Sequence, residues 1–153
     1  MKKNAVALAV LLLFSSLVTS CAPKSVSYDL VYGTDEIASI AIYYFEESLN
    51  GKIDDSYEPL VVLDESRYEE MIQDITGLPL TDVSFPVGLI FSPKFSCYGY
   101  VVLITYEDTS YQQISSQGIQ WYGDGEGNDN CTHYDCDDEI WLAMIEKYLP
   151  VSE

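Results

Sequence analysis

Acidic and amide side chains gather in residues 123–130, GDGEGNDN, at a spacing that could bind a cation. Side-chain oxygen atoms at alternate or adjacent positions are typical of calcium loops. Here they belong to Asp124, Glu126, Asn128 and Asp129. The EF-hand pattern does not fit, because Asp129 stands where glycine is expected and Asp135 stands where glutamate is expected. The residues predict an irregular calcium loop or, as the competing interpretation, a solvated loop between strands. No other cofactor is indicated.

The single histidine, His133, lies in CTHYDC, residues 131–136. Cys131 and His133 would share one face of a strand, so a nucleophile and its base are conceivable there. No lipase-type or papain-like motif accompanies them, and the chain has no glycine-rich phosphate loop. A surface or edge histidine is the favoured interpretation, and we assign no catalytic residue.

Three of the four cysteines, Cys97, Cys131 and Cys136, lie in the second half of the chain and raise the question of a disulfide. Outside the cytoplasm one pair is expected to form, which leaves one cysteine over. In an extended strand, Cys131 and Cys136 would lie about 16 Å apart, beyond the roughly 7 Å that a disulfide spans. In a simple meander, Cys97 and Cys136 fall at the same end of the sheet. The sequence therefore favours Cys97–Cys136, with Cys131 as the alternative partner of Cys97.

The chain begins with the pattern of a secretion signal. Lys2 and Lys3 precede a run in which every residue from 5 to 14 is apolar, and small residues follow. Ten apolar residues rise only about 15 Å as a helix, half the thickness of a bilayer core. The segment is a poor permanent span, and we expect residues 1–20 to be a cleaved signal peptide.

The end of this segment, Val18-Thr19-Ser20-Cys21, resembles the lipobox of bacterial lipoproteins. The resemblance implies that the Cys21 sulfur receives a diacylglyceryl group and becomes the first residue after cleavage. Two acyl chains suffice for stable anchoring. Residues 21–27 then form the lipidated cysteine and its tether. The expected location is the outer face of a cell membrane, or the outer membrane in a Gram-negative host, where Ala22 argues against retention in the inner membrane.

The chain is strongly acidic. Its net charge is −18, and removing residues 1–20 takes away two lysines and no acid, which gives −20. Nucleic acid and anionic lipid headgroups are repelled by such a surface. Solubility is the simplest explanation of the negative charge. If the charge serves binding, the partner is expected to be a cationic protein or peptide.

Strand patterns recur along the mature chain. Tyrosines and aliphatic residues alternate in 26–32, and 37–45 is apolar on both faces, which indicates a central strand. Further strands are expected at 59–63, 87–91, 98–106, 111–116, 119–122 and 131–135.

Two helices are predicted, at about 64–77 and 137–149. In the first, Tyr68, Met71, Ile72 and Ile75 recur at helical spacing, Asp64 can cap the start and Gly77 can end the helix. In the second, the expected core stripe comprises Ile140, Trp141, Met144, Ile145, Tyr148 and Leu149. Asp137 to Glu139 suit its N-terminal end and Lys147 its C-terminal end.

The order of these elements predicts an α+β fold in one domain, residues 28–153. We expect an antiparallel β-sheet of about five to seven strands with the two helices packed on one face. Most connections between strands are too short for parallel pairing.

The hairpin YGYVVLITYEDTSYQQIS and the ending YDCDDEIWLAMIEKYL resemble small lipoproteins of Gram-positive bacteria whose function is not known, so no activity follows from the resemblance. The leading hypothesis is a membrane-anchored, non-catalytic binding or interaction module, because the chain combines an anchor with one compact domain and no catalytic constellation. The alternatives are an extracytoplasmic hydrolase and an acidic inhibitor or immunity-type protein that binds a basic partner.

Overall fold

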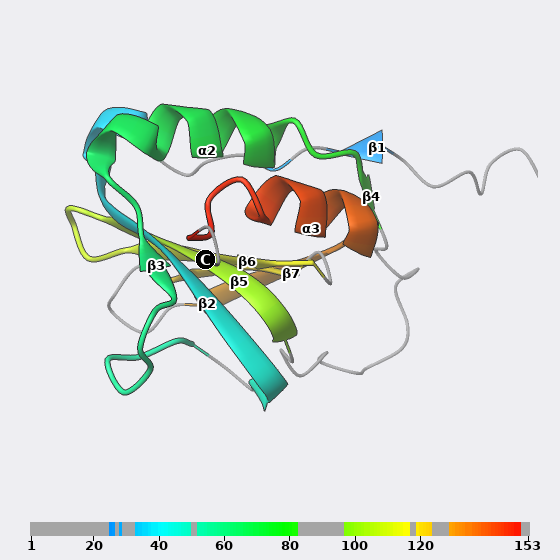
Figure 1. Cartoon of the computed structure of the whole chain (residues 1–153), viewed down its shortest axis with the longest axis horizontal. Helices are drawn as coiled ribbons and strands as arrows, with labels where there is room; N and C mark the ends of the chain where they lie inside the picture. Colours follow the sequence, from blue (N-terminus) through cyan, green and yellow to red (C-terminus); the bar gives the residue numbers. More distant parts are fainter. Residues whose placement is uncertain are drawn as a thin grey trace, which may run out of the picture.

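The computed structural model describes residues 25–26, 28, 33–49, 52–82, 97–116, 119–123 and 129–150. These form an α+β domain in which two helices lie over one face of a twisted sheet (Figure 1). The strands are β1 (Ser25–Val26), β2 (Ile37–Leu49), β3 (Val61–Val62), β4 (Leu80–Asp82), β5 (Cys97–Tyr106), β6 (Tyr111–Ser115), β7 (Ile119–Gly123) and β8 (Asp129–Asp135). The helices are α2 (Tyr68–Thr76) and α3 (Asp138–Ile145), with short 3-10 turns η2 (Thr34–Glu36) and η3 (Glu65–Arg67).

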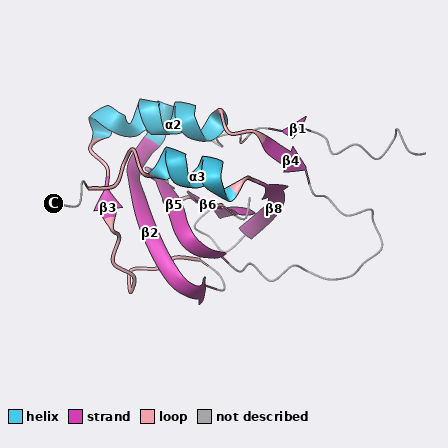
Figure 2. Ribbon diagram, turned by 45° about the vertical axis from the view of Figure 1, so that its right-hand side comes forward, coloured by secondary structure: helices cyan, strands magenta, loops and turns pink. Residues whose placement is uncertain are grey.

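The described sheet has eight strands in the order β1-β4-β8-β7-β6-β5-β2-β3, and all neighbouring strands pair antiparallel. Strands β5 to β8 form a meander, and α2 carries the chain from β3 at one edge to β4 near the other (Figure 2). The predicted α+β class, antiparallel sheet and two helices are confirmed. The eight strands exceed the predicted five to seven. Strands β1 and β3 overlap the strands predicted at 26–32 and 59–63, β4 was not predicted, and the strand predicted at 87–91 lies outside the described residues.

Strands β2 and β5 are the two longest strands, lie side by side and are apolar on both faces. The helix-covered face carries Ile40, Ile42, Val102, Ile104 and Ile114, clustered with side chains of α2 and α3. The opposite face carries Ala41, Tyr43 and Val101, which pack with Ile53 from the segment after β2. Burial on both sides explains why these strands read as continuous apolar runs.

An aspartate caps the 3-10 turn that leads into α2, and another caps α3. Asp64 accepts hydrogen bonds from the Ser66 hydroxyl and amide, which together lower the pKa of Asp64. Asp137 accepts from the amides of Glu139 and Ile140. Each helix is shorter than predicted. The first turn after Asp64 is the 3-10 turn η3, and α3 is followed by i→i−3 bonds such as Tyr148 N to Ile145 O, which tighten the chain.

Candidate functional site

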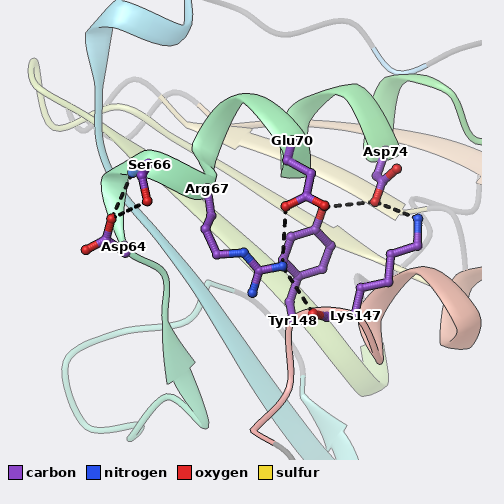
Figure 3. A network of polar contacts seen from close by, with 7 residues as sticks. All are labelled: Asp64, Ser66, Arg67, Glu70, Asp74, Lys147 and Tyr148. Atoms are coloured by element: carbon purple, nitrogen blue, oxygen red, sulfur yellow. Dashed lines mark hydrogen bonds and ion pairs between the residues drawn. The ribbon is translucent and has the colours of Figure 1, made fainter.

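A carboxylate on α2 joins the two helices. The Asp74 Oδ2 atom accepts hydrogen bonds from the Tyr148 hydroxyl and from Lys147 Nζ, both at 2.9 Å (Figure 3). Tyr148 is 2% exposed, so its hydroxyl needs an acceptor inside the protein. Burial, and then the hydrogen bond to Asp74 and its charge, raise the pKa of Tyr148.

Arg67 also contacts Tyr148, over the face of its ring. Its guanidinium lies 4.4 Å from the ring centroid, within the range of a cation–π interaction. It also donates to the Lys147 carbonyl at 3.1 Å and pairs with Glu70 at 3.4 Å (Figure 3). We call Arg67, Asp74, Lys147 and Tyr148 the clasp, because they fix the chain after α3 against α2.

A shallow cavity of about 340 Å³ lies beside the clasp, between the end of α2 and α3. We call it the α2–α3 groove. Its lining residues are Asp74, Gly77, Leu78, Pro79, Ile140, Ala143, Met144 and Lys147. The ion pair of Asp74 and Lys147 therefore supplies its charged part, and aliphatic side chains supply most of the rest. Pro79 follows the end of α2 and turns the chain away from the helix axis, which leaves room between the helices.

The groove side of α3 is more exposed than the sequence predicts. Ile140, which the periodicity assigns to the core stripe, is 42% exposed and lines the groove. Trp141, Met144, Ile145 and Tyr148 are buried as expected. Every residue from 140 to 145 is apolar, so helical spacing alone could not tell which of them face solvent.

Two carboxylates on or next to α3 lie outside the groove lining. Glu139 and Glu146 stand four residues before and three residues after Ala143, which places them one turn to either side of it. Both are exposed. Within the described parts of the chain the ion pairs are Arg67–Glu70 and Lys147–Asp74, and neither involves these two glutamates.

Aromatic residues form a second exposed surface at the far end of β2 and β5. Tyr44 and Tyr98 are about half exposed, and the Tyr44 and Tyr100 rings lie 4.9 Å apart. The neighbouring edge of β2 carries exposed Glu46 and Glu47 and a register shift after Phe45. Charges and irregular pairing are devices that keep other strands off an edge, so we do not assign a site there.

The sheet interior holds several buried polar groups. The Tyr106 hydroxyl donates to the side-chain Oε1 of Gln112, and the side-chain Oε1 of Gln113 accepts from the Ile53 amide at 2.9 Å. Trp141 Nε1 and Ser115 Oγ are buried, and neither has a hydrogen-bond partner among the described residues. None of these contacts pairs a nucleophile with a base, so the chemistry that they support is structural.

Several predicted site residues lie outside the described residues. These include Cys21 and, in the predicted calcium loop, Asp124, Glu126 and Asn128, whereas Asp129 begins β8 without a described side chain. His133 pairs with Ile119 through the backbone of β8. In the portions that the structure describes, no three histidine, cysteine or acidic side chains are grouped to hold a metal, and no helix has the length and apolarity to cross a membrane.

The strand order disfavours the predicted disulfide. Cys97 begins β5 and Cys136 directly follows β8, and the registers place them near the same end of the sheet, as expected. However, β6 and β7 lie between the two strands, and three strand spacings amount to about 14 Å. This exceeds the roughly 7 Å that a disulfide spans. The same separation applies to Cys131 in β8. Instead, the Cys136 thiol donates to the Asp137 carbonyl at 3.7 Å.

The chain matches no family model, no curated protein and no solved structure. Its candidate site therefore depends on geometry alone. An apolar groove between two helices that are joined by the clasp can accept an apolar group. The two charged side chains that line it, Asp74 and Lys147, are paired with each other.

Proposed function

We propose that this protein is an extracytoplasmic lipoprotein, anchored to a bacterial membrane through Cys21, which acts as a non-catalytic binding module. The α2–α3 groove is its binding surface. The observation that carries the proposal is the exposed apolar wall of α3 beside the clasp. The exposed Ile140 side chain contributes little to the stability of the fold, whereas a bound partner would bury it.

The clasp supports this role by holding the groove walls in place before any partner arrives. Its contacts join residues that are 73 and 74 positions apart, Lys147 with Asp74 and Tyr148 with Asp74. A surface that is already ordered loses less conformational entropy on binding. The contacts therefore favour a groove that is preformed.

The ionisable groups of the groove argue for binding rather than catalysis. Asp74 and Lys147 line it, and each is engaged with the other at 2.9 Å. Asp74 also accepts from Tyr148, so its carboxylate is committed to the fold. A general base or nucleophile must instead meet the substrate at hydrogen-bond distance.

The anchor is supported by the lipobox at Val18 to Cys21 and by the absence of acidic residues before it. It predicts a mature protein whose first residue is an acylated cysteine. The test is the intact mass of the full chain extracted from membranes. A mass that retains residues 1–20, or a bare thiol at Cys21, would contradict the proposed anchoring.

The binding role needs its own test. Turnover of a substrate in an activity screen, abolished by substitution of His133, would overturn the non-catalytic proposal in favour of a hydrolase. Ligand binding that is sensitive to Ile140→Gln and insensitive to Leu142→Gln would support it. Leu142 is the matched control, because it is 41% exposed on the same helix and does not line the groove.

A further inference from the structure

We infer that β3 binds an extended basic segment of a partner protein, which adds to the sheet as a further strand. Strand β3 is the last strand of the described sheet and pairs there with β2 alone, at the edge that Figure 2 shows. This edge shares no residue with the lining of the α2–α3 groove, so the inference goes beyond the proposed function and is tested separately from it.

The backbone of β3 has an open edge. The Leu60 amide donates to the Ile42 carbonyl at 2.8 Å, and the Leu63 amide donates to the Ile40 carbonyl at 2.9 Å. Successive residues of a strand point their amide and carbonyl groups to opposite edges, so those of Val62 point away from β2. No described strand lies on that side. An extended peptide can form backbone hydrogen bonds there, as in β-strand addition.

The exposed side chains of this edge are apolar. Leu60 is 53% exposed and Val62 is 60% exposed. In contrast, Leu63 is buried in the core cluster beneath the helices, and Val61 packs against that cluster. The inward residues therefore fix β3 to the domain, whereas a partner strand would bury the outward ones.

Acidic residues flank the edge on both sides. Residues 53–66 contain five acids and no lysine or arginine, and all five are exposed: Asp54, Asp55, Glu58, Asp64 and Glu65. None of them belongs to an ion pair of the described residues. Hydrogen bonds from Ser56 and Ser66 lower the pKa of Asp54 and Asp64, so both carboxylates are charged at neutral pH.

The basic residues at the two ends of this stretch are engaged elsewhere. The Lys52 Nζ atom lies 4.1 Å from the centroid of the Tyr111 ring, and Arg67 belongs to the clasp. The described fold thus offers the acids of 54–65 no cation. Lysines or arginines of a partner strand would supply the missing positive charge.

The same charges argue against other occupants. A short edge strand with charged flanks is a known device against unwanted pairing of strands. Here the flanking charge has one sign. It repels acidic strands and a second copy of this chain, whose net charge is −18, whereas it attracts a basic strand. A segment that alternates apolar and basic residues matches both the apolar edge and its acidic flanks.

The segment before β3 is already held against the sheet. Ile53 is buried, and its amide donates to Oε1 of Gln113 at 2.9 Å. The Tyr57 ring packs edge-on against the Phe45 ring of β2, with the centroids 5.3 Å apart. Because these contacts order the acidic flank in the free protein, less conformational entropy is lost when a partner binds.

The experiment uses the full acylated chain in phosphatidylcholine vesicles and a peptide probe. The probe alternates valine and lysine over about eight residues, the length of an ordinary strand. Calorimetric titration measures its dissociation constant, and vesicles without protein give the background. We expect saturable binding that weakens about tenfold between roughly 50 and 500 mM NaCl. No saturation above background would overturn the inference.

A backbone variant tests the strand addition. Val62→Pro removes the outward amide without removing a hydrogen bond to β2, which is where an edge strand tolerates proline. It should weaken binding about tenfold, whereas Val62→Thr, which keeps the amide, should weaken binding less than about threefold. Thermal unfolding checks that each variant is folded. Unchanged affinity in folded Val62→Pro would overturn the strand addition.

Hydrogen exchange tests the same contact without a substitution. Saturating peptide should slow exchange of the Val62 amide about tenfold or more, because the amide becomes hydrogen-bonded. The Leu63 amide, which already donates to β2, should change little. NMR of the full chain in detergent micelles measures both amides. Exchange at Val62 that does not respond to the peptide would contradict the inference.

Charge variants test the acidic flanks. Glu58→Gln/Glu65→Gln should weaken binding about fivefold at 150 mM NaCl, about the ionic strength at which the Debye length is 8 Å. Asp138→Asn/Glu139→Gln makes the same change of charge beside β8, five strand spacings or about 24 Å from β3, and should weaken binding less than about twofold. Equal losses in the two double variants would overturn the role of the flanks.

Two further outcomes would identify a different occupant. A valine–glutamine peptide that binds as tightly as the valine–lysine peptide would overturn the basic partner. A concentration-dependent dimer that Val62→Pro abolishes, measured by sedimentation, would overturn the inference in favour of a second copy of the chain.

Discussion

The two helices cover the same face of the sheet but divide their residues differently. Helix α2 buries Met71, Ile72 and Ile75 and exposes polar side chains such as Glu69, Glu70 and Gln73. Helix α3 buries Trp141, Met144 and Ile145 and yet leaves Ile140, Leu142 and Ala143 exposed.

The difference shows which part of each helix the fold requires. The polar outer face of α2 is what an amphipathic helix on a water-exposed surface needs. The outer face of α3 instead carries the apolar side chains of Ile140, Leu142 and Ala143, which the packing of its inner face against the core leaves exposed.

The largest expected effect separates the inner from the outer face of α3. Trp141→Ala should lower the free energy of unfolding by about 3–5 kcal/mol, because it removes a large side chain that is 2% exposed. Ile140→Ala should change it by less than about 0.5 kcal/mol, as at other surface positions. Urea unfolding measures both. Similar losses for the two variants would mean that Ile140 is part of the core.

The contact between the helices should come next in size. Asp74→Ala removes the acceptor of the Tyr148 hydroxyl and should cost about 1–3 kcal/mol, because the hydroxyl is left unsatisfied. Tyr148→Phe removes the donor instead and should cost less. The double variant should be less unstable than the sum of the single variants. Additive effects would show that the hydrogen bond does not couple α2 to the end of α3.

A smaller effect should develop in alkaline solution. Folding raises the pKa of Tyr148, so its contribution to stability is complete below pH about 10, the pKa in the unfolded chain, and decreases as the pH rises toward the folded pKa. Tyr148→Phe should flatten this decrease, measured by urea unfolding between neutral pH and pH 11. Tyr98→Phe, at an exposed site, is the control. An unchanged slope in Tyr148→Phe would contradict the proposed cause.

The smallest effect concerns Glu146 at the C-terminal end of α3. Glu146→Gln removes a charge that opposes the helix dipole and should raise stability by a few tenths of a kcal/mol, up to about 1 kcal/mol. Glu69→Gln, in the first turn of α2, should instead lower stability slightly. Thermal unfolding at low ionic strength measures the pair. A loss of stability in Glu146→Gln would indicate that this carboxylate has a partner within the fold.

Local signals in the sequence predicted much of the fold. The runs around Ile40 and Val102 identified the two longest strands, and Asp64, which was predicted as a cap, caps the 3-10 turn that leads into α2. The acidic residues 137–139 marked the start of α3. These features depend on neighbouring residues, which explains the success. The three-residue strand β4 was missed because hydrophobic alternation requires at least about four residues to be recognised.

The candidate site depended on contacts that local patterns do not contain. Asp74 meets Tyr148 across 74 positions, and no spacing rule connects them. The exposure of Ile140 was missed because six consecutive apolar residues hide the helical period. Strand order also bears on the cysteines, since the predicted meander places Cys97 and Cys136 near the same end of the sheet but keeps them apart by the two strands that it contains, 111–116 and 119–122.

The pairing of β4 determines when the sheet can be completed during folding. Thr81 and Asp82 pair with Asp135 and Tyr134, and Ser25 pairs with Thr81, so residues near both ends of the domain meet at one edge. Such distant pairings close slowly, because much of the chain must be ordered first. Strands β1 and β4 pair with each other, but they join the rest of the sheet only through β8. Truncation before Asp129 should therefore leave the hairpins of β5 to β7 able to form while β1 and β4 stay separate from them.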